Sequence, residues 1–102
     1  MANSIMQHNT RRCYLCGGPP EYYDSLDLHH VFNGANKKKS EKYGLMVYLH
    51  HNKCHIFGKE AVHNNAKNNR ALKAKAQKIA MQEYGWDVGT FRRIFGKNYI
   101  EE

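Results

Sequence analysis

The sequence has few of the features that stabilise secreted or membrane-bound domains. It contains three cysteines and two prolines among 102 residues. An odd number of cysteines would leave one thiol over in any disulfide framework, so metal binding in a reducing compartment is the favoured use. No apolar run approaches the length that spans a bilayer, and residues 1–10 lack the apolar core of a signal peptide. These absences predict one cytoplasmic domain with no membrane partner.

Acidic residues are also scarce. Nine Asp and Glu stand against 16 Lys and Arg, which gives a formal net charge of +7 and a pI of about 9.4. A strongly basic balance on a small chain favours a polyanionic partner, and nucleic acid is the commonest one. The charge therefore predicts DNA as a partner.

Two strand-like segments lie in the first half of the chain. Residues 26–32 alternate in polarity, so His30 is expected on one face of a strand and His29 on the other. Residues 45–49 are rich in residues that favour strands. We expect the two segments to pair as an antiparallel hairpin, joined by a basic, glycine-containing loop over residues 33–40.

Helix-forming residues dominate the second half, so the sequence predicts an α+β fold. A helix is expected from residue 64 or 65 to Tyr84, ended by Gly85. Asp87 is expected to cap a shorter helix that Gly96 closes. An aromatic and aliphatic cluster is interpreted as the core that docks this last unit: Trp86, Phe91, Ile94, Phe95 and Tyr99. Most cations of the long helix are interpreted as a solvated face: Lys67, Arg70, Lys73, Lys75 and Lys78.

The cysteines have the spacing of a structural zinc site. Cys13-x-x-Cys16 supplies half of a tetrahedral set, and Cys54 is the remaining thiol. His51-x-x-Cys54 would complete a Cys3His site for Zn2+. His50 is the alternative fourth ligand, because its spacing to Cys54 is only one residue longer.

A second group of histidines is left over: His29, His30, His55 and His63. Neighbouring residues on a strand face apart, so His29 and His30 cannot both bind one ion. One can hold a divalent ion while the other faces water, which suits hydrolysis of a phosphodiester. The rival interpretation is a non-catalytic, zinc-binding module that binds nucleic acid.

The motifs resemble one known superfamily when taken in order along residues 13–64. Cys13-x-x-Cys16-Gly17, then Leu-x-Leu-His-His-Val-Phe over residues 26–32, then Cys54-His55 and Val62-His63 are similar to the HNH, or ββα-metal (His-Me finger), endonucleases. The resemblance is strongest to small prophage-encoded HNH proteins and more distant to phage recombination nucleases of the Ref type. It implies a flexible arm over residues 1–12, a zinc knuckle and ββα-metal core over residues 13–64, and a C-terminal helical extension over residues 65–102.

The resemblance also implies a function and a setting. The activity would be metal-dependent DNA cleavage in phage recombination or DNA processing, carried out in the cytoplasm of a bacterial host. So small a chain has little surface for reading bases, so a second copy of the chain, or a host or phage recombination protein, is the further partner expected.

The superfamily assigns roles to the histidines and cysteines by position. His29 would bind the catalytic ion with His55 and His63, and His30 would be the general base. Cys13, Cys16 and Cys54 would hold the zinc. The catalytic ion would be Mg2+, Mn2+, Ni2+ or Zn2+, and imidazole ligands favour the transition metals.

Two positions depart from the superfamily pattern. The fourth zinc ligand is usually cysteine, whereas this chain offers His50 or His51. Met46 or a neighbour stands where the middle asparagine is expected, and Asn33 or Asn36 would have to fix the loop instead. Within that loop we expect three lysines to contact the DNA backbone: Lys37, Lys38 and Lys39.

Overall fold

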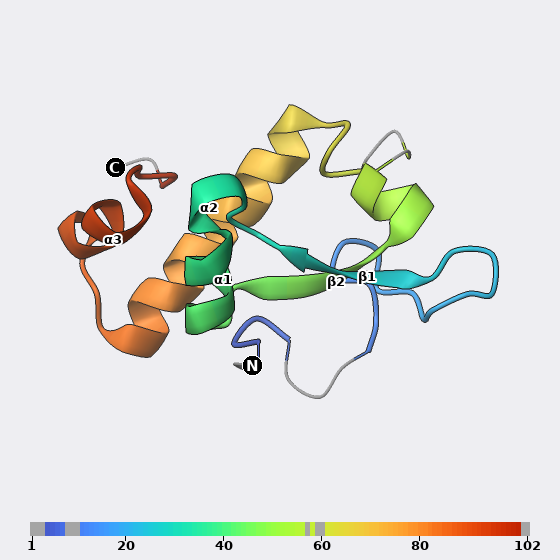
Figure 1. Ribbon diagram of the computed structural model, residues 1–102, viewed down its shortest axis with the longest axis horizontal. Helices are drawn as coiled ribbons and strands as arrows, with labels where there is room; N and C mark the ends of the chain where they lie inside the picture. The colour runs from blue at the N-terminus through green and yellow to red at the C-terminus, as the bar shows by residue number, and fades with distance from the viewer. Residues whose placement is uncertain (1–3, 8–10, 57, 59–60, 101–102) are drawn as a thin grey trace.

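A short antiparallel hairpin lies at the centre of the molecule (Figure 1). The computed structural model of the chain describes residues 4–7, 11–56, 58 and 61–100. Strand β1 (Leu26–His30) pairs with β2 (Met46–His50), with Leu26 opposite His50 and His30 opposite Met46. The expected α+β class and the hairpin are confirmed, with strand ends shifted by one or two residues.

The connection between the strands is helical, which corrects the expected loop over residues 33–40. A 3₁₀ turn, η1 (Gly34–Asn36), leads into helix α1 (Lys37–Tyr43), which ends at Gly44 with a φ of 75°. Lys and Glu favour a helix once it is started. The buried Ser40 hydroxyl donates to the carbonyl of Phe32 at 2.6 Å and accepts from its N–H at 3.0 Å. Ser40 therefore fixes the connection to the end of β1.

The second half of the chain is helical as expected. Helix α2 (Ala66–Tyr84) begins after Asn65, whose side chain accepts from the N–H of Asn68, and it ends at Gly85 in the left-handed conformation. Helix α3 (Val88–Phe95) begins after Asp87, whose side chain accepts from the N–H of Thr90, and it ends at Gly96. The predicted cap at Asp87 and both predicted glycine stops are confirmed, and the cap at Asn65 is a feature that the sequence analysis did not assign.

Between the hairpin and α2 runs a single turn of π-helix, η2 (His51–Ile56). The carboxylate of the buried Asp24 accepts from the backbone N–H groups of Asn52 and Lys53, at 2.7 and 3.0 Å. An acidic side chain at the amino end of a helical turn satisfies N–H groups that have no partner within the turn. Asp24 therefore holds η2 in place, and η2 carries Cys54 and His55.

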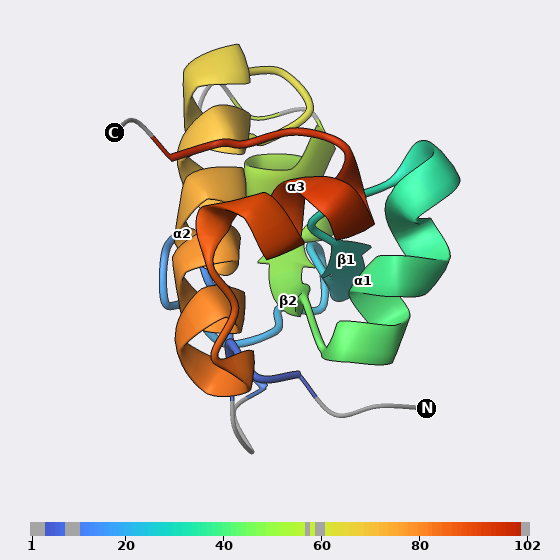
Figure 2. The ribbon, with the colours of Figure 1, turned by 90° about the vertical axis from the view of Figure 1, so that its left-hand side faces the viewer.

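The core lies between the sheet and the helices. Figure 2 shows the hairpin between α2 on one side and α1 on the other, with α3 in front of both. Phe91 and Phe95 of α3 are buried against Phe32, with ring centroids 5.6 and 4.7 Å apart. Trp86, Ile94 and Tyr99 are partly buried and pack against this core, so the docking interpretation of the aromatic cluster is confirmed. None of the helices in the described ranges is both long and apolar enough to cross a membrane.

Candidate metal centres

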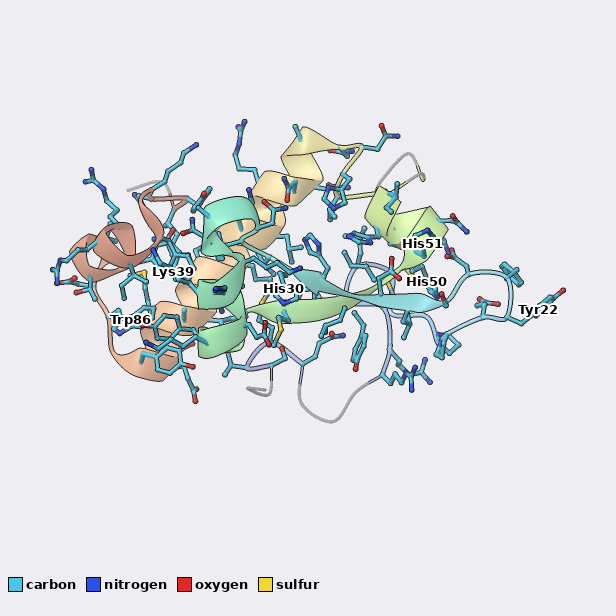
Figure 3. All side chains as sticks on the ribbon, in the orientation of Figure 1. Tyr22, His30, Lys39, His50, His51 and Trp86 are labelled. Atoms are coloured by element: carbon cyan, nitrogen blue, oxygen red, sulfur yellow. The ribbon has the colours of Figure 1, made fainter. Side chains whose placement is uncertain are left out.

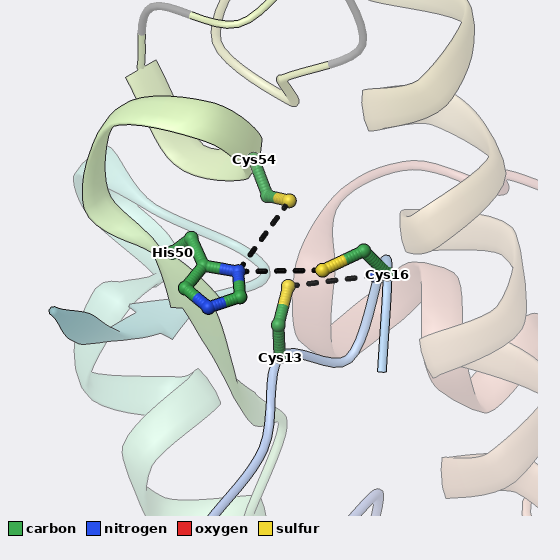
Figure 4. A group of neighbouring side chains, drawn as sticks. All are labelled: Cys13, Cys16, His50 and Cys54. Carbon is green, nitrogen blue, oxygen red and sulfur yellow. Dashed lines mark hydrogen bonds between the residues drawn. The ribbon is translucent and has the colours of Figure 1, made fainter. Parts of the chain in front are cut away.

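Four side chains from three parts of the chain meet at the first centre (Figure 4). Cys13 and Cys16 come from the knuckle, His50 from the last position of β2, and Cys54 from η2. Each offers one ligand atom, and these atoms all lie within 4.8 Å of one another. The four residues form a Cys3His cluster that can hold a metal ion such as zinc.

The knuckle turn owes its shape to two glycines. The N–H of Gly17 donates to the carbonyl of Cys13 at 2.7 Å, and Gly17 has a φ of 78°, which disfavours other residues. A Cβ on Gly18 would lie 3.1 Å from Cε1 of His50. A larger residue here would press on the imidazole of His50, so glycine lets the knuckle approach it closely. The N–H of Tyr14 donates to the carbonyl of Tyr48 at 2.7 Å and holds the knuckle against β2.

The imidazole of His50 has the orientation that a zinc ligand needs. Its Nε2 donates to the carbonyl of Pro19 at 2.7 Å, which leaves Nδ1 as the lone-pair nitrogen. Nδ1 lies 3.3 Å from Sγ of Cys16 and 4.0 Å from Sγ of Cys54. Zinc–ligand bonds of ordinary length in a tetrahedron would place such atoms about 3.6 Å apart. A backbone acceptor on the second ring nitrogen is a common feature of metal-bound histidines.

The surroundings of Cys13 and Cys54 shift the pKa values of these two thiols in opposite directions. Burial raises the pKa of the Cys13 thiol, but hydrogen bonds from the backbone of Cys16 and His50 and from the Cys54 side chain outweigh it and bring the pKa down to about 7. Burial, followed by the nearby Cys13 and Cys16, raises the pKa of Cys54. A cation that stabilises thiolates is the physical answer to such crowding.

His51, the first choice for the fourth ligand, lies outside this cluster. Its Nδ1 lies 2.6 Å from Oδ2 of Asp27 on β1. Figure 3 labels both histidines at the η2 end of the hairpin. His50 is the final residue of β2 and is buried, whereas His51 is the first residue of η2, so their rings diverge. The structure thus replaces His51 by the alternative ligand, His50.

Three histidines form a second centre beside the first. The ring centroid of His29 lies 5.0 Å from that of His55 and 5.5 Å from that of His63, and the latter two are 4.7 Å apart. The Nε2 atoms of His55 and His63 lie 3.1 Å apart. Two imidazole nitrogens on one zinc-sized ion would lie about 3.3 Å apart. The candidate ligands taken from the resemblance are thus brought together, as a cluster that can hold a second ion.

Backbone hydrogen bonds, rather than a continuous helix, bring His63 to this centre. The N–H of His63 donates to the carbonyl of His55 at 3.0 Å, and the N–H of Val62 donates to that of Cys54 at 2.9 Å. Part of the segment between η2 and Ala61, namely residues 57, 59 and 60, lies outside the described residues. The two centres are therefore coupled through the backbone of neighbouring residues in η2.

The His29 ring is buried and lacks a polar partner. Only 4% of the residue is exposed, and its Nε2 has no hydrogen-bond partner within the described parts of the chain. Burial, together with the nearby His55, His63, His30 and Lys73, lowers the pKa of His29 to about 3. The ring is therefore neutral at physiological pH. A buried neutral imidazole with an unpaired nitrogen has the state that a metal ligand requires.

Asp27, which the sequence did not single out, orients the triad from behind. Its Oδ2 accepts from Nδ1 of His55 at 2.8 Å, so Nε2 of His55 faces His63. Burial raises the pKa of Asp27, but hydrogen bonds from His55 and His51 outweigh it and lower the pKa. A carboxylate on the far nitrogen of a ligating histidine fixes its tautomer and increases its basicity. The sequence signal was available, because Asp27 shares the strand face of His29.

His30 does not join the triad. Its Nε2 is buried and faces Glu41 of α1, with 3.7 Å between Nε2 and Oε2. The expected divergence of His29 and His30 across β1 is thus what the structure shows. Asn33 and Asn36 were the asparagines proposed to fix the connection between the strands. The Asn36 amide donates to the carbonyl of Phe95 at 3.0 Å, whereas the Asn33 side chain makes no cap hydrogen bond.

The three expected DNA-binding lysines lie on α1 and not on a loop. Lys37 and Lys38 are exposed in its first turn, and Nζ of Lys39 donates to the carbonyl of Ile94 at 2.6 Å. Figure 3 shows Lys39 at the α3 end of the molecule, well away from His51. Lys39 is therefore engaged in docking α3.

Comparison of the chain with family models, with curated proteins and with solved structures gives no match. The interpretation of the two centres therefore depends on their own geometry.

Proposed function

We propose that this protein is a metal-dependent DNA endonuclease with the ββα-metal architecture of the HNH superfamily. The observation that carries the proposal is the triad of His29, His55 and His63, backed by the Asp27 carboxylate and placed directly beside a Cys3His cluster. A non-catalytic zinc-binding module would need only the Cys3His cluster. The triad is a second set of converging imidazoles, and the buried Nε2 of His29 has no hydrogen-bond partner among the described residues, which a bound ion would explain.

The residues present fit the two ions that the proposal requires. Three thiols and the Nδ1 of His50 suit Zn2+ in a closed tetrahedral site. Three imidazoles leave open positions on an ion for water and substrate, and they favour a transition metal over Mg2+. The chemistry that such a divalent ion supplies when bound is polarisation of the phosphodiester and stabilisation of the leaving oxygen.

The chain's own residues would divide the remaining work. His29, His55 and His63 would hold the ion, and Asp27 keeps the His55 ring in the orientation that a ligand needs. His30 is the proposed general base, with Glu41 as the carboxylate nearest its Nε2. Phage DNA recombination or processing is the proposed setting.

Plasmid nicking tests the proposal. Purified protein with its zinc in place is incubated with supercoiled DNA, with and without added Mn2+, Ni2+ or Mg2+, beside the His29→Ala and His55→Ala variants. Metal-dependent nicking that both substitutions abolish supports the proposal. Absence of nicking with every ion, in protein that binds a second ion through the triad, would contradict it and favour a non-catalytic nucleic-acid-binding module.

A further inference from the structure

A basic cavity lies between the first half of α2 and the chain that follows α3. Figure 2 shows this C-terminal segment crossing α2 near its amino end. The cavity has a volume of about 360 Å³, within the range of ligand sites. Arg70, Lys73 and Lys97 line it together with the side-chain amides of Asn69 and Asn98, and its described lining contains no carboxylate.

The basic surface continues past this cavity. A second hollow of about 370 Å³ shares Arg70, Tyr99 and Ile100 with the first and adds Lys67 and Lys78. Lys67, Arg70 and Lys78 all belong to α2, and Tyr99 lines both hollows. An extended row of cations fits a strand with regularly spaced phosphates better than a small anion.

The C-terminal wall of the cavity is held in place by a fully buried glutamine. Gln77 accepts from the N–H of Tyr99 at 2.7 Å and donates to Oδ1 of Asn98 at 2.8 Å. The Asn98 amide in turn donates to the carbonyl of Ile100 at 2.8 Å. A tail fixed in this way loses little conformational freedom when a ligand binds.

The cations are held near one another without being neutralised. Nζ of Lys73 and Nζ of Lys97 lie 5.6 and 5.4 Å from the centroid of the Tyr99 ring, on which both are positioned. In the described part of the chain, neither lysine nor Arg70 lies within ion-pair distance of a carboxylate. Lys73 also lies near enough to the histidine triad to interact electrostatically with His29 and His63.

We propose that this surface binds the backbone phosphates of a nucleic-acid strand and leads that strand to the histidine triad. The inference rests on the proposed function for the meaning of the triad. Arg70 offers a planar pair of donors that matches a phosphate, and Lys73 and Lys97 add two point charges over the ring of Tyr99. This proposal gives Arg70 and Lys73 a role beyond that of a solvated face.

Binding measured without cleavage tests this proposal separately from the enzymatic one. Fluorescence anisotropy of labelled duplex and single-stranded DNA is recorded over a series of salt concentrations, with zinc-loaded protein and no other divalent ion. The Arg70→Ala/Lys97→Ala variant is compared with Lys75→Ala/Arg92→Ala, which removes the same charge. Lys75 and Arg92 lie outside the cavity lining, and Nζ of Lys75 lies over the ring of Tyr14.

The cavity variant should bind the preferred DNA form about tenfold more weakly or worse. Its salt dependence should fall by about two released counterions, while the control keeps the dependence of the unchanged protein. Equal effects in the two variants, or no DNA binding by the unchanged protein, would overturn the proposal. All four substituted residues are exposed, and circular dichroism checks that the variants are folded. Cavity-dependent binding by a protein that never nicks DNA would support this site and refute the endonuclease.

Discussion

The carboxylate of Asp27 fixes the ring of His55. Oδ2 of Asp27 lies 2.8 Å from Nδ1 of His55, and Nε2 on the other side of that ring lies 3.1 Å from Nε2 of His63. The carboxylate of Asp27 would thus act on an ion in the triad through the ring of His55. Removing such a partner weakens metal binding without removing a ligand.

Asp27→Ala should therefore lower the affinity for the second ion by about 10- to 100-fold. Isothermal titration with Mn2+ or Ni2+ measures this, and the tightly bound zinc should be unchanged because the Cys3His cluster does not include Asp27. His51→Ala is the matched control, since it removes the other histidine that contacts Oδ2 of Asp27 and leaves the contact with His55 in place. An Asp27→Ala protein with undiminished affinity would show that packing alone orients His55.

The zinc cluster makes a prediction that separates two adjacent histidines. His50→Ala and Cys54→Ser should each lose the tightly bound zinc, and the melting temperature should fall sharply because a structural zinc contributes directly to folding. His51→Ala should keep one zinc per chain, since the ring of His51 contacts the carboxylate of Asp27 and lies outside the Cys3His cluster. Zinc content by atomic absorption and thermal unfolding by circular dichroism provide the readouts. Loss of zinc from His51→Ala with retention in His50→Ala would restore the original choice of ligand.

Local sequence signals predicted most of the fold. The strand around His29, the cap at Asp87 and the stops at Gly85 and Gly96 follow from periodicity and from backbone preferences, which act within a few residues. Helix α1 was missed because its three consecutive lysines suggested a solvated loop. Its stability depends on Ser40, which bonds to Phe32 eight residues earlier, and no local pattern reveals such a contact.

The candidate site was likewise predicted only in part. Ligand types and spacing identified the cysteines and histidines, but the choice between His50 and His51 depends on where β2 ends and η2 begins, and element ends are set by tertiary contacts. The contact between Asp27 and His55 depends on how β1 and η2 pack, and the position of Arg70 and Lys97 around one cavity depends on how α2 and the C-terminal segment pack. Sequence separation hides these pairs.

The two histidines of the strand should respond differently to removal. His30→Ala should keep the second ion and DNA binding yet lose cleavage by about 10²-fold or more, the usual effect of losing a general base. His29→Ala should lose the ion together with activity, because its Nε2 belongs to the triad. Single-turnover nicking and metal titration on both variants provide the comparison. A His30→Ala enzyme of normal rate would assign proton removal to another group.

The lysines of α1 should contribute less to DNA binding than their number suggests. Lys39 donates to the carbonyl of Ile94, so only Lys37 and Lys38 are available to phosphates. Lys37→Ala/Lys38→Ala should reduce the salt dependence of DNA binding by at most about two counterions, whereas Lys39→Ala should lower the stability with little effect on that slope. Anisotropy titrations and urea unfolding measure the two effects. A larger change of slope for Lys39→Ala than for the double variant would mean that Lys39 leaves Ile94 to contact DNA.

Gln77 is the buried polar residue on which the C-terminal segment depends. Gln77→Leu keeps the volume but removes the acceptor of the Tyr99 N–H and one donor to Asn98, which leaves buried polar groups without partners. We expect the free energy of unfolding to fall by about 1–3 kcal/mol in urea titrations. Gln82→Leu makes the same change at an exposed position of α2 and should be close to neutral. If Gln77→Leu also weakens DNA binding as much as Arg70→Ala/Lys97→Ala does, the fixed tail is needed for the phosphate site. If stability falls while DNA affinity is unchanged, Gln77 supports only the fold.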